Sequence, residues 1–334
     1  MKSNIDGILA LARLSNEFLI DIRKLMYLCE KANLSKDNPD DIEKLRVKLQ
    51  NDKESIDRDT LFLPTESQVY NLFFGGSGHD DITVKYETEA LTGFDLLVMS
   101  AIYTLYRTGC IKTTYKRIYR YIGGNSSPNQ EQRNKIRNSI RKLMSYQVDI
   151  DNTQSVIYIH GKGDGYKRFS KSANLIDVKI NNNPSDDEYS TIWIYDKPVI
   201  FEYCETLHNR ITTFPIKSLF PPKSKIDESR ANILLCLIRR LVMSESNNSV
   251  IATDCIRFAS LYQELKIDKP TDKMKRSRTR KYILNFLNHF RDTEVIYYFK
   301  ATDTNIRFMS EKLQIKKAKI DKRKEMIEEQ KTTP

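Results

Sequence analysis

Basic side chains gather in one stretch of the sequence, between Lys273 and Lys281, which contains no acidic residue. Lysine and arginine release the counterions condensed on nucleic acid, and arginine also hydrogen-bonds guanine through two donors. Asparagine reads adenine in a similar bidentate way, and two asparagines follow this stretch. The chemistry predicted here is recognition of double-stranded DNA. The expected contact residues are Lys273, Lys275, Arg276, Ser277, Arg278, Arg280, Lys281, Asn285 and Asn288.

Residues 270–290 also have the two faces of an amphipathic helix. The apolar stripe consists of Ile283, Leu284, Phe286, Leu287 and Phe290. On the opposite face, the side chains expected to reach base edges are Arg278, Lys281, Asn285 and Asn288. Those expected to hold phosphates are Lys273, Lys275, Arg276 and Arg280. The alternative interpretation is a core helix with an ordinary charged face in water.

Two weaker groups of basic residues occur earlier in the chain. A helix expected at 130–145 carries one group on its outward positions, and a glycine-rich loop after residue 160 carries the other. The loop residues are expected to contact phosphate or the minor groove. The helix group is Arg137, Asn138, Arg141 and Lys142, and the loop group is Lys162, Lys167 and Arg168, followed by Lys171.

Residues for catalysis or metal binding lack the required spacing. The four histidines do not pair with each other, with cysteine or with carboxylates at metal-ligand spacing. The five cysteines are spread widely and form no CxxC motif, which predicts neither a disulfide framework nor a zinc site. Acidic residues 80–81 and 186–188 are interpreted as solvated loop charge. We therefore expect no cofactor, no metal and no enzymatic activity.

The whole chain is basic. Its 334 residues carry a formal net charge of +11, with a pI near 9.2. This charge favours a polyanionic partner, with nucleic acid preferred to an anionic membrane surface. No apolar run reaches the roughly 18 residues that a membrane span needs. The cysteine pattern and this composition predict a cytoplasmic protein.

Periodicity predicts an α+β, mainly helical chain with two similar units. Three helices followed by a β-hairpin form the winged-helix order, so we expect two tandem winged-helix domains, at 82–196 and 227–310, the second of which recognises DNA. The first is expected to hold helices 93–107, 115–122 and 130–145 and strands 82–86, 155–160, 175–180 and 191–195. The second is expected to hold helices 228–243, 255–265 and 270–290, a short strand at 250–251 and a hairpin of 295–300 with 305–309.

The other segments are expected to extend or connect these domains. Residues 1–60 predict a helical extension, and 311–334 a charged tail. Residues 61–81 are interpreted as a linker, and the proline-rich residues 197–226 as a fairly stiff connector.

Several short motifs resemble plasmid and mobile-element replication initiator proteins. They are Leu91-Thr92-Gly93-Phe94-Asp95, the run from Ala101 to Tyr106, Arg117-Ile118-Tyr119-Arg120 and Gly123-Gly124. The resemblance covers roughly residues 85–310 and implies two winged-helix domains. It also implies repeated origin sites read by the second domain, a homodimer formed through the first, and recruitment of host replication proteins. The extension of residues 1–60 departs from this family pattern.

Three functions follow as alternatives. The first is a sequence-specific initiator of plasmid or mobile-element replication, in a bacterial cytoplasm. The second is a winged-helix transcriptional regulator, including a repressor of its own promoter. The third is a nicking enzyme, which would need a metal or an activated tyrosine. A membrane-associated or scaffolding role is a further alternative.

Overall fold

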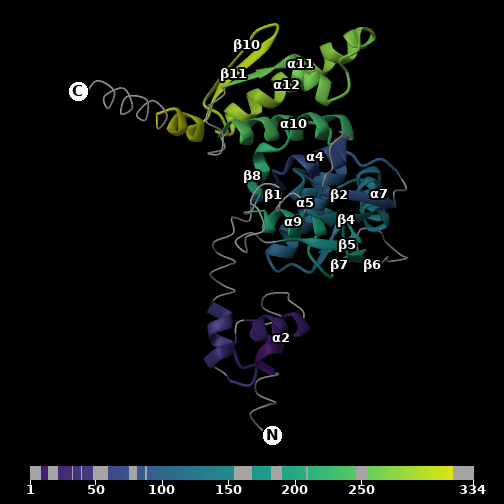
Figure 1. Ribbon diagram of the computed structural model, residues 1–334, viewed down its shortest axis with the longest axis vertical. Coiled ribbons are helices and arrows are strands. Elements are labelled where there is room, and N and C mark those ends of the chain that lie inside the picture. The colour runs from purple at the N-terminus through teal and green to yellow at the C-terminus, as the bar shows by residue number, and fades with distance from the viewer. Residues whose placement is uncertain are drawn as a thin grey trace, which may run out of the picture. The chain divides into compact units, whose positions relative to one another are not determined.

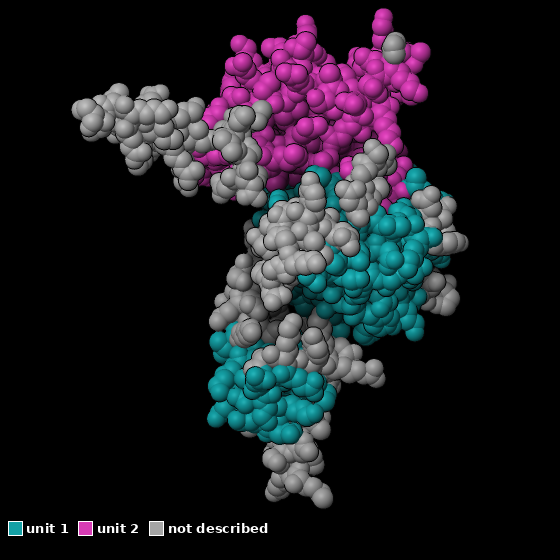
Figure 2. All heavy atoms as spheres, viewed as in Figure 1, with its two compact units in different colours: residues 1–69, 78–90, 95–216 teal, residues 70–77, 91–94, 217–334 magenta. Residues whose placement is uncertain are grey.

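The computed structural model describes residues 9–13, 22–31, 33–38, 40–47, 59–74, 81–86, 89–153, 168–181, 190–207, 210–245 and 254–318 (Figure 1). Helices and small antiparallel sheets make the fold class α+β. The chain divides into two compact units (Figure 2). Unit 1 comprises residues 1–69, 78–90 and 95–216, and unit 2 comprises residues 70–77, 91–94 and 217–334. Across the described ranges, every helix is too short or too polar to cross a bilayer.

Helical segments near the N-terminus pack on one another. They are residues 9–13, α2 (Ile22–Lys31) and residues 40–47. Their shared apolar cluster consists of Leu11, Leu25, Cys29, Ile42 and Leu45. The helical character predicted for residues 1–60 is confirmed over these described segments.

The three helices predicted for the first unit are confirmed as α5 (Gly93–Arg107), α6 (Tyr115–Tyr121) and α7 (Gln130–Ser145). Polar caps fix where two of them begin. The Thr114 hydroxyl accepts a hydrogen bond from the Arg117 amide at the start of α6. Asn129 and Gln132 form a reciprocal capping box at the start of α7.

The β-strands of unit 1 form two three-stranded antiparallel sheets. The first has the order β2 (Ile82–Tyr86), β4 (Gln147–Asp151), β5 (Ser170–Asn174). The second has the order β3 (Lys112–Thr114), β7 (Thr191–Ile194), β6 (Val178–Asn181). The strand predicted at 155–160 lies outside the described residues. Strands β4 and β5 were not predicted, and the strand predicted at 175–180 begins only at Val178, as β6.

The two segments expected to link domains are structured. The first holds β1 (Thr60–Pro64) and α4 (Ser67–Phe74). The second holds α9 (Val199–Thr206), β8 (Ile211–Pro215) and a 3-10 turn (Ile216–Ser218).

Pairing and burial explain this difference. β1 pairs antiparallel with β8, and α9 buries its apolar face in unit 1. The ring of Phe201 stacks on that of Tyr103 with centroids 3.9 Å apart. Pro198 precedes α9 and Pro215 ends β8, so these prolines mark element ends and do not stiffen an open connector.

Between residues 227 and 310, unit 2 contains a helix, a strand, two helices and a hairpin, in that order, and a further helix follows at 311–318. These are α10 (Glu228–Glu245), β9 (Cys255–Arg257), α11 (Phe258–Glu264), α12 (Lys273–Asp292), β10 (Tyr298–Ala301) and β11 (Asn305–Met309). The strands form an antiparallel sheet in the order β10-β11-β9. Asp227 accepts a hydrogen bond from the Arg230 amide at 2.9 Å and so caps α10.

The start of α11 differs from the prediction. A helix was expected from Cys255, but residues 255–257 form β9 and α11 begins only at Phe258. The reason is non-local, because Ile256 is buried opposite Ile306 in the sheet. The strand predicted at 250–251 lies outside the described residues.

Candidate nucleic-acid interface

Helix α12 buries the apolar stripe that its sequence predicts. Its buried residues are Thr279, Ile283, Phe286, Leu287, His289 and Phe290. Leu284 is only partly buried. The Phe286 ring meets that of Phe220 edge-on, with centroids 5.9 Å apart. This packing fixes which side of the helix is left for a partner.

The opposite side of α12 presents an exposed row of side chains. Met274, Ser277, Arg278, Lys281 and Asn285 are all exposed and recur at steps of three or four residues. Asn288 continues the row and is partly buried. The row therefore includes the residues predicted to reach base edges.

Lys273 and Lys275 flank this row and are also exposed. The Lys275 ammonium lies 3.5 Å from an Asp272 carboxylate oxygen, and its side chain is 73% exposed. Such a surface ion pair contributes little to stability, so it would not prevent Lys275 from meeting a phosphate.

Arg276 has a structural environment that the sequence did not predict. Its guanidinium donates to the carbonyl oxygens of Ile267, Asp268 and Lys269, and lies 6.0 Å from the Tyr262 ring centroid. The side chain therefore holds the turn between α11 and α12. These contacts give Arg276 a structural role on the turn, and its expected contact with a phosphate stays a prediction.

Arg280 also makes several contacts within unit 2. It donates to the carbonyl oxygens of Asp303 at 3.0 Å and Thr302 at 2.8 Å. Its guanidinium also lies 4.6 Å from the ring centroid of Phe258. These contacts connect the β10–β11 turn to α12, and the expected phosphate contact at Arg280 stays a prediction.

The β10–β11 hairpin carries a pair of cations that the sequence analysis missed. Lys300 lies directly opposite Arg307, and both side chains are exposed. Like charges at opposite positions destabilise a strand pair, so this arrangement does not favour the hairpin by itself. A phosphate between the two would remove the repulsion. Period-two alternation in both strands was the signal that could have revealed the pair.

The candidate residues on α7 divide between two environments. Asn138 and Arg141 are exposed, as a DNA contact requires. Arg137 is partly buried, and its Nε donates to the Tyr115 hydroxyl at 3.3 Å. Lys142 lies 2.9 Å from a carboxylate oxygen of Asp95, with side chains only 13% and 3% exposed. Lys142 is thus a largely buried ion-pair partner, and its expected DNA contact stays a prediction.

The glycine-rich loop gives less information. Lys162 and Lys167 lie outside the described residues, and Arg168 is exposed just before β5. Lys171, expected as a wing contact, donates to Glu202 at 2.7 Å. That ion pair ties β5 to α9, so Lys171 is held within unit 1.

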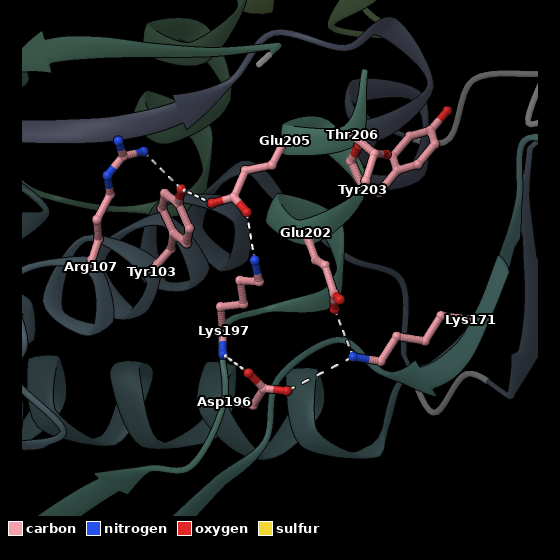
Figure 3. Close-up of polar contacts among 9 residues, drawn as sticks. All are labelled: Tyr103, Arg107, Lys171, Asp196, Lys197, Glu202, Tyr203, Glu205 and Thr206. Atoms are coloured by element: carbon pink, nitrogen blue, oxygen red, sulfur yellow. Dashed lines mark hydrogen bonds and ion pairs between the residues drawn. The ribbon is translucent and has the colours of Figure 1, made fainter. Parts of the chain in front are cut away.

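Lys171 belongs to a cluster of polar contacts that includes a tyrosine, the residue type that a nicking enzyme could use as its nucleophile (Figure 3). The Tyr103 hydroxyl donates to Glu205 at 2.7 Å, and Arg107 donates to the Tyr103 oxygen at 3.1 Å. Lys197 contacts the second carboxylate oxygen of Glu205. Burial first, and then Glu205, raise the pKa of Tyr103, so its hydroxyl stays protonated. This environment disfavours the deprotonated form of Tyr103 that a nucleophile would need. The contacts are better explained as a network that stabilises the fold.

Thiol and metal chemistry find no support in the described part of the chain. Burial raises the pKa of the Cys204 and Cys236 thiols and so disfavours the reactive thiolate. No three His, Cys, Asp or Glu side chains converge on a metal position within the described ranges. Buried His289 bonds the Lys217 carbonyl oxygen through Nε2 at 2.9 Å, and burial lowers its pKa.

Comparison with known proteins gives little further information. The sequence matches no protein-family model, and no curated protein matches it. Among solved structures, the crystal structure of domains 2 and 3 of RctB aligns with 74% of this chain and 98% of that chain, at a TM-score of 0.37 and 12% identity. This similarity is too low to support a conclusion about function.

Proposed function

We propose that this protein binds double-stranded DNA sequence-specifically, with the exposed row of α12 in the major groove. The observation that carries the proposal is the row itself, since Ser277, Arg278, Lys281 and Asn285 stand outward while the other face is packed. The major groove admits an α-helix, and arginine and asparagine read guanine and adenine there. Lys273 and Lys275 would then neutralise phosphates at the groove edge.

The order of elements in unit 2 supports a winged-helix reading. In that reading α11 and α12 form the helix-turn-helix, α12 is the recognition helix and the β10–β11 hairpin is the wing. The Arg280 contacts would hold the wing beside the recognition helix. Lys300 and Arg307 would then meet phosphate together with α12.

Unit 1 has a related order with different strand pairing. Its elements α5, β3, α6, α7, β4 and β5 follow one another as in unit 2. However, the β4–β5 hairpin pairs with β2, while β3 pairs with β7. We therefore propose unit 1 as a modified winged helix, with Asn138, Arg141 and Arg168 as weaker DNA contacts.

The biological role that we propose is initiation of replication of a plasmid or mobile element, without a catalytic step. This role rests on the resemblance of residues 85–310 to replication initiators, which also implies a homodimer and host replication proteins as partners. A transcriptional regulator would use the same interface, so the arrangement of DNA sites must distinguish the two roles.

The test is selection of genomic duplex fragments by the purified full chain at about 0.15 M salt, followed by sequencing. A narrow set with short direct repeats supports an initiator, and the repeats should support replication of a linked circle when the protein is supplied. A single inverted repeat upstream of a gene favours the regulator. Retention without enrichment of any sequence contradicts sequence-specific binding.

A matched pair of variants tests the placement of α12. Arg278→Ala should weaken binding to the selected site by about 1–3 kcal/mol, because it removes a base contact. Arg291→Ala removes the same charge from the C-terminal end of the helix and should leave affinity close to wild type. Equal effects of the two variants on titrated affinity would contradict recognition through the exposed row.

A further inference from the structure

Met274 is an exposed apolar side chain within a basic surface. It is 82% exposed, whereas the next most exposed large hydrophobic side chain in the described ranges, Tyr195, is 58% exposed. It shares a face of α12 with Arg278 and lies between Lys273 and Lys275 in sequence. A single exposed hydrophobic residue is ordinary on a protein surface. However, packing does not explain why Met274 lies in the exposed row of α12.

A partner for this surface must satisfy two conditions. It must offer anionic groups to the lysines and, between them, a small apolar group to the Met274 side chain. The major groove provides both, because the thymine 5-methyl group lies on its floor between two phosphate backbones. An anionic membrane would also provide both. However, the row continues with Ser277, Lys281 and Asn285, which are too polar to enter a bilayer.

We propose that Met274 packs against the 5-methyl group of a thymine in the DNA site and selects for that base. The inference rests on the proposed function, because it places α12 in the major groove. Met274 and Arg278 are one turn apart, about 6 Å along the helix axis. Base pairs follow at about 3.4 Å, so the thymine should lie within about two base pairs of the base that Arg278 contacts.

The experiment removes the methyl group from the DNA and the thioether from the protein. Each thymine of the selected site is replaced in turn by deoxyuridine, which lacks only the 5-methyl group. We expect one replacement to weaken wild-type binding about threefold to tenfold, as loss of one buried methyl contact should. Met274→Ala should bind the thymine site more weakly and be insensitive to that replacement. Met274→Leu should keep the sensitivity, because it keeps an apolar contact.

Met243→Ala is the matched control, since Met243 is an exposed methionine of unit 2 on α10. It should retain the wild-type response to deoxyuridine. Unfolding in urea should give the same free energy for Met274→Ala as for wild type, because the side chain packs on so little.

The outcomes separate this inference from the proposed function. If wild type and Met274→Ala respond equally to every deoxyuridine, the methyl contact is wrong while sequence-specific binding stands. If wild type selects no sequence, the proposed function fails first. If wild type binds phosphatidylglycerol vesicles and Met274→Ala does not, a membrane is the partner and the thymine assignment is overturned.

Discussion

The ion pair between Lys142 and Asp95 holds a cation of α7 against a buried carboxylate. The two side chains lie 2.9 Å apart and are largely shielded from water. Lys142 also donates to the carbonyl oxygen of Ala90 at 3.2 Å. The lysine therefore neutralises a buried carboxylate at the start of α5.

Replacing Lys142 by alanine should lower the free energy of unfolding by about 3–5 kcal/mol, because Asp95 would remain buried without this cation. Arg141→Ala, on the same helix but exposed, should change it by no more than about 0.5 kcal/mol. Urea unfolding of both variants measures the difference. A Lys142→Ala protein as stable as Arg141→Ala would mean that the carboxylate is readily solvated.

Residue type alone could not separate these roles. The sequence correctly placed Arg278, Lys281 and Asn285 outward, since helical spacing relates them directly to the buried stripe. It could not identify the partners of Arg276, which are backbone carbonyls in the preceding turn. These hydrogen bonds depend on the conformation of the backbone between α11 and α12, which residue types and spacing do not predict.

At the scale of elements, the hairpin and the helix α12 are joined by Arg280. The planar guanidinium meets two successive carbonyl oxygens and lies over an aromatic ring. Lysine has one compact ammonium and cannot reproduce this geometry.

Arg280→Ala and Arg280→Lys should both lower the free energy of unfolding by about 1–2 kcal/mol and speed amide exchange in β10 and β11. Lys281→Ala, its exposed neighbour, is the control and should leave both measurements near wild type. If Arg280→Ala keeps full stability but weakens binding to every DNA alike, Arg280 is a phosphate contact, and its hydrogen bonds to the β10–β11 turn do not stabilise the fold.

Local periodicity predicted most helices, because α5, α7, α10 and α12 each repeat apolar residues at helical spacing. It failed where pairing is non-local. β1 and β8 stabilise each other across about 150 residues of chain, so neither is evident alone. β4 alternates Val148 and Ile150 inward with polar residues outward, a usable signal that acidic residues obscured.

For the whole molecule, the net charge of +11 gives long-range attraction to any polyanion. At physiological salt the screening length is about 8 Å, so only cations close to the phosphates contribute to affinity. The salt dependence of the binding constant therefore reflects the number of phosphate contacts and not the total charge of the protein.

Lys275→Ala should reduce the slope of log K against log salt by about 0.9, equally for selected and random duplexes. Lys312→Ala removes an equal charge from an exposed position on the helix at 311–318 and should leave the slope unchanged. Affinities from about 0.05 to 0.3 M salt give the slopes. Identical slopes for wild type and Lys275→Ala would exclude Lys275 as a phosphate contact.

Unit 2 draws on segments that are distant in sequence. The Arg239 guanidinium lies 5.0 Å from the ring centroid of Tyr70, and the Gly93 amide donates to the Asn232 side chain at 2.7 Å. A Cβ at Gly93 would stand 2.5 Å from that Asn232 oxygen and 3.1 Å from the Asn232 backbone nitrogen, so a larger residue there would have to displace the Asn232 side chain.

This arrangement determines when unit 2 can fold during translation. The ribosome delivers residues 70–77 and 91–94 early, yet their partners in unit 2 emerge only after residue 217. At roughly 5–20 residues per second, the early segments wait several seconds or more for α10 and α12. The nascent chain can therefore complete much of unit 1 before α12 has been synthesised. The recognition of DNA that we propose for α12 must wait until unit 2 has folded.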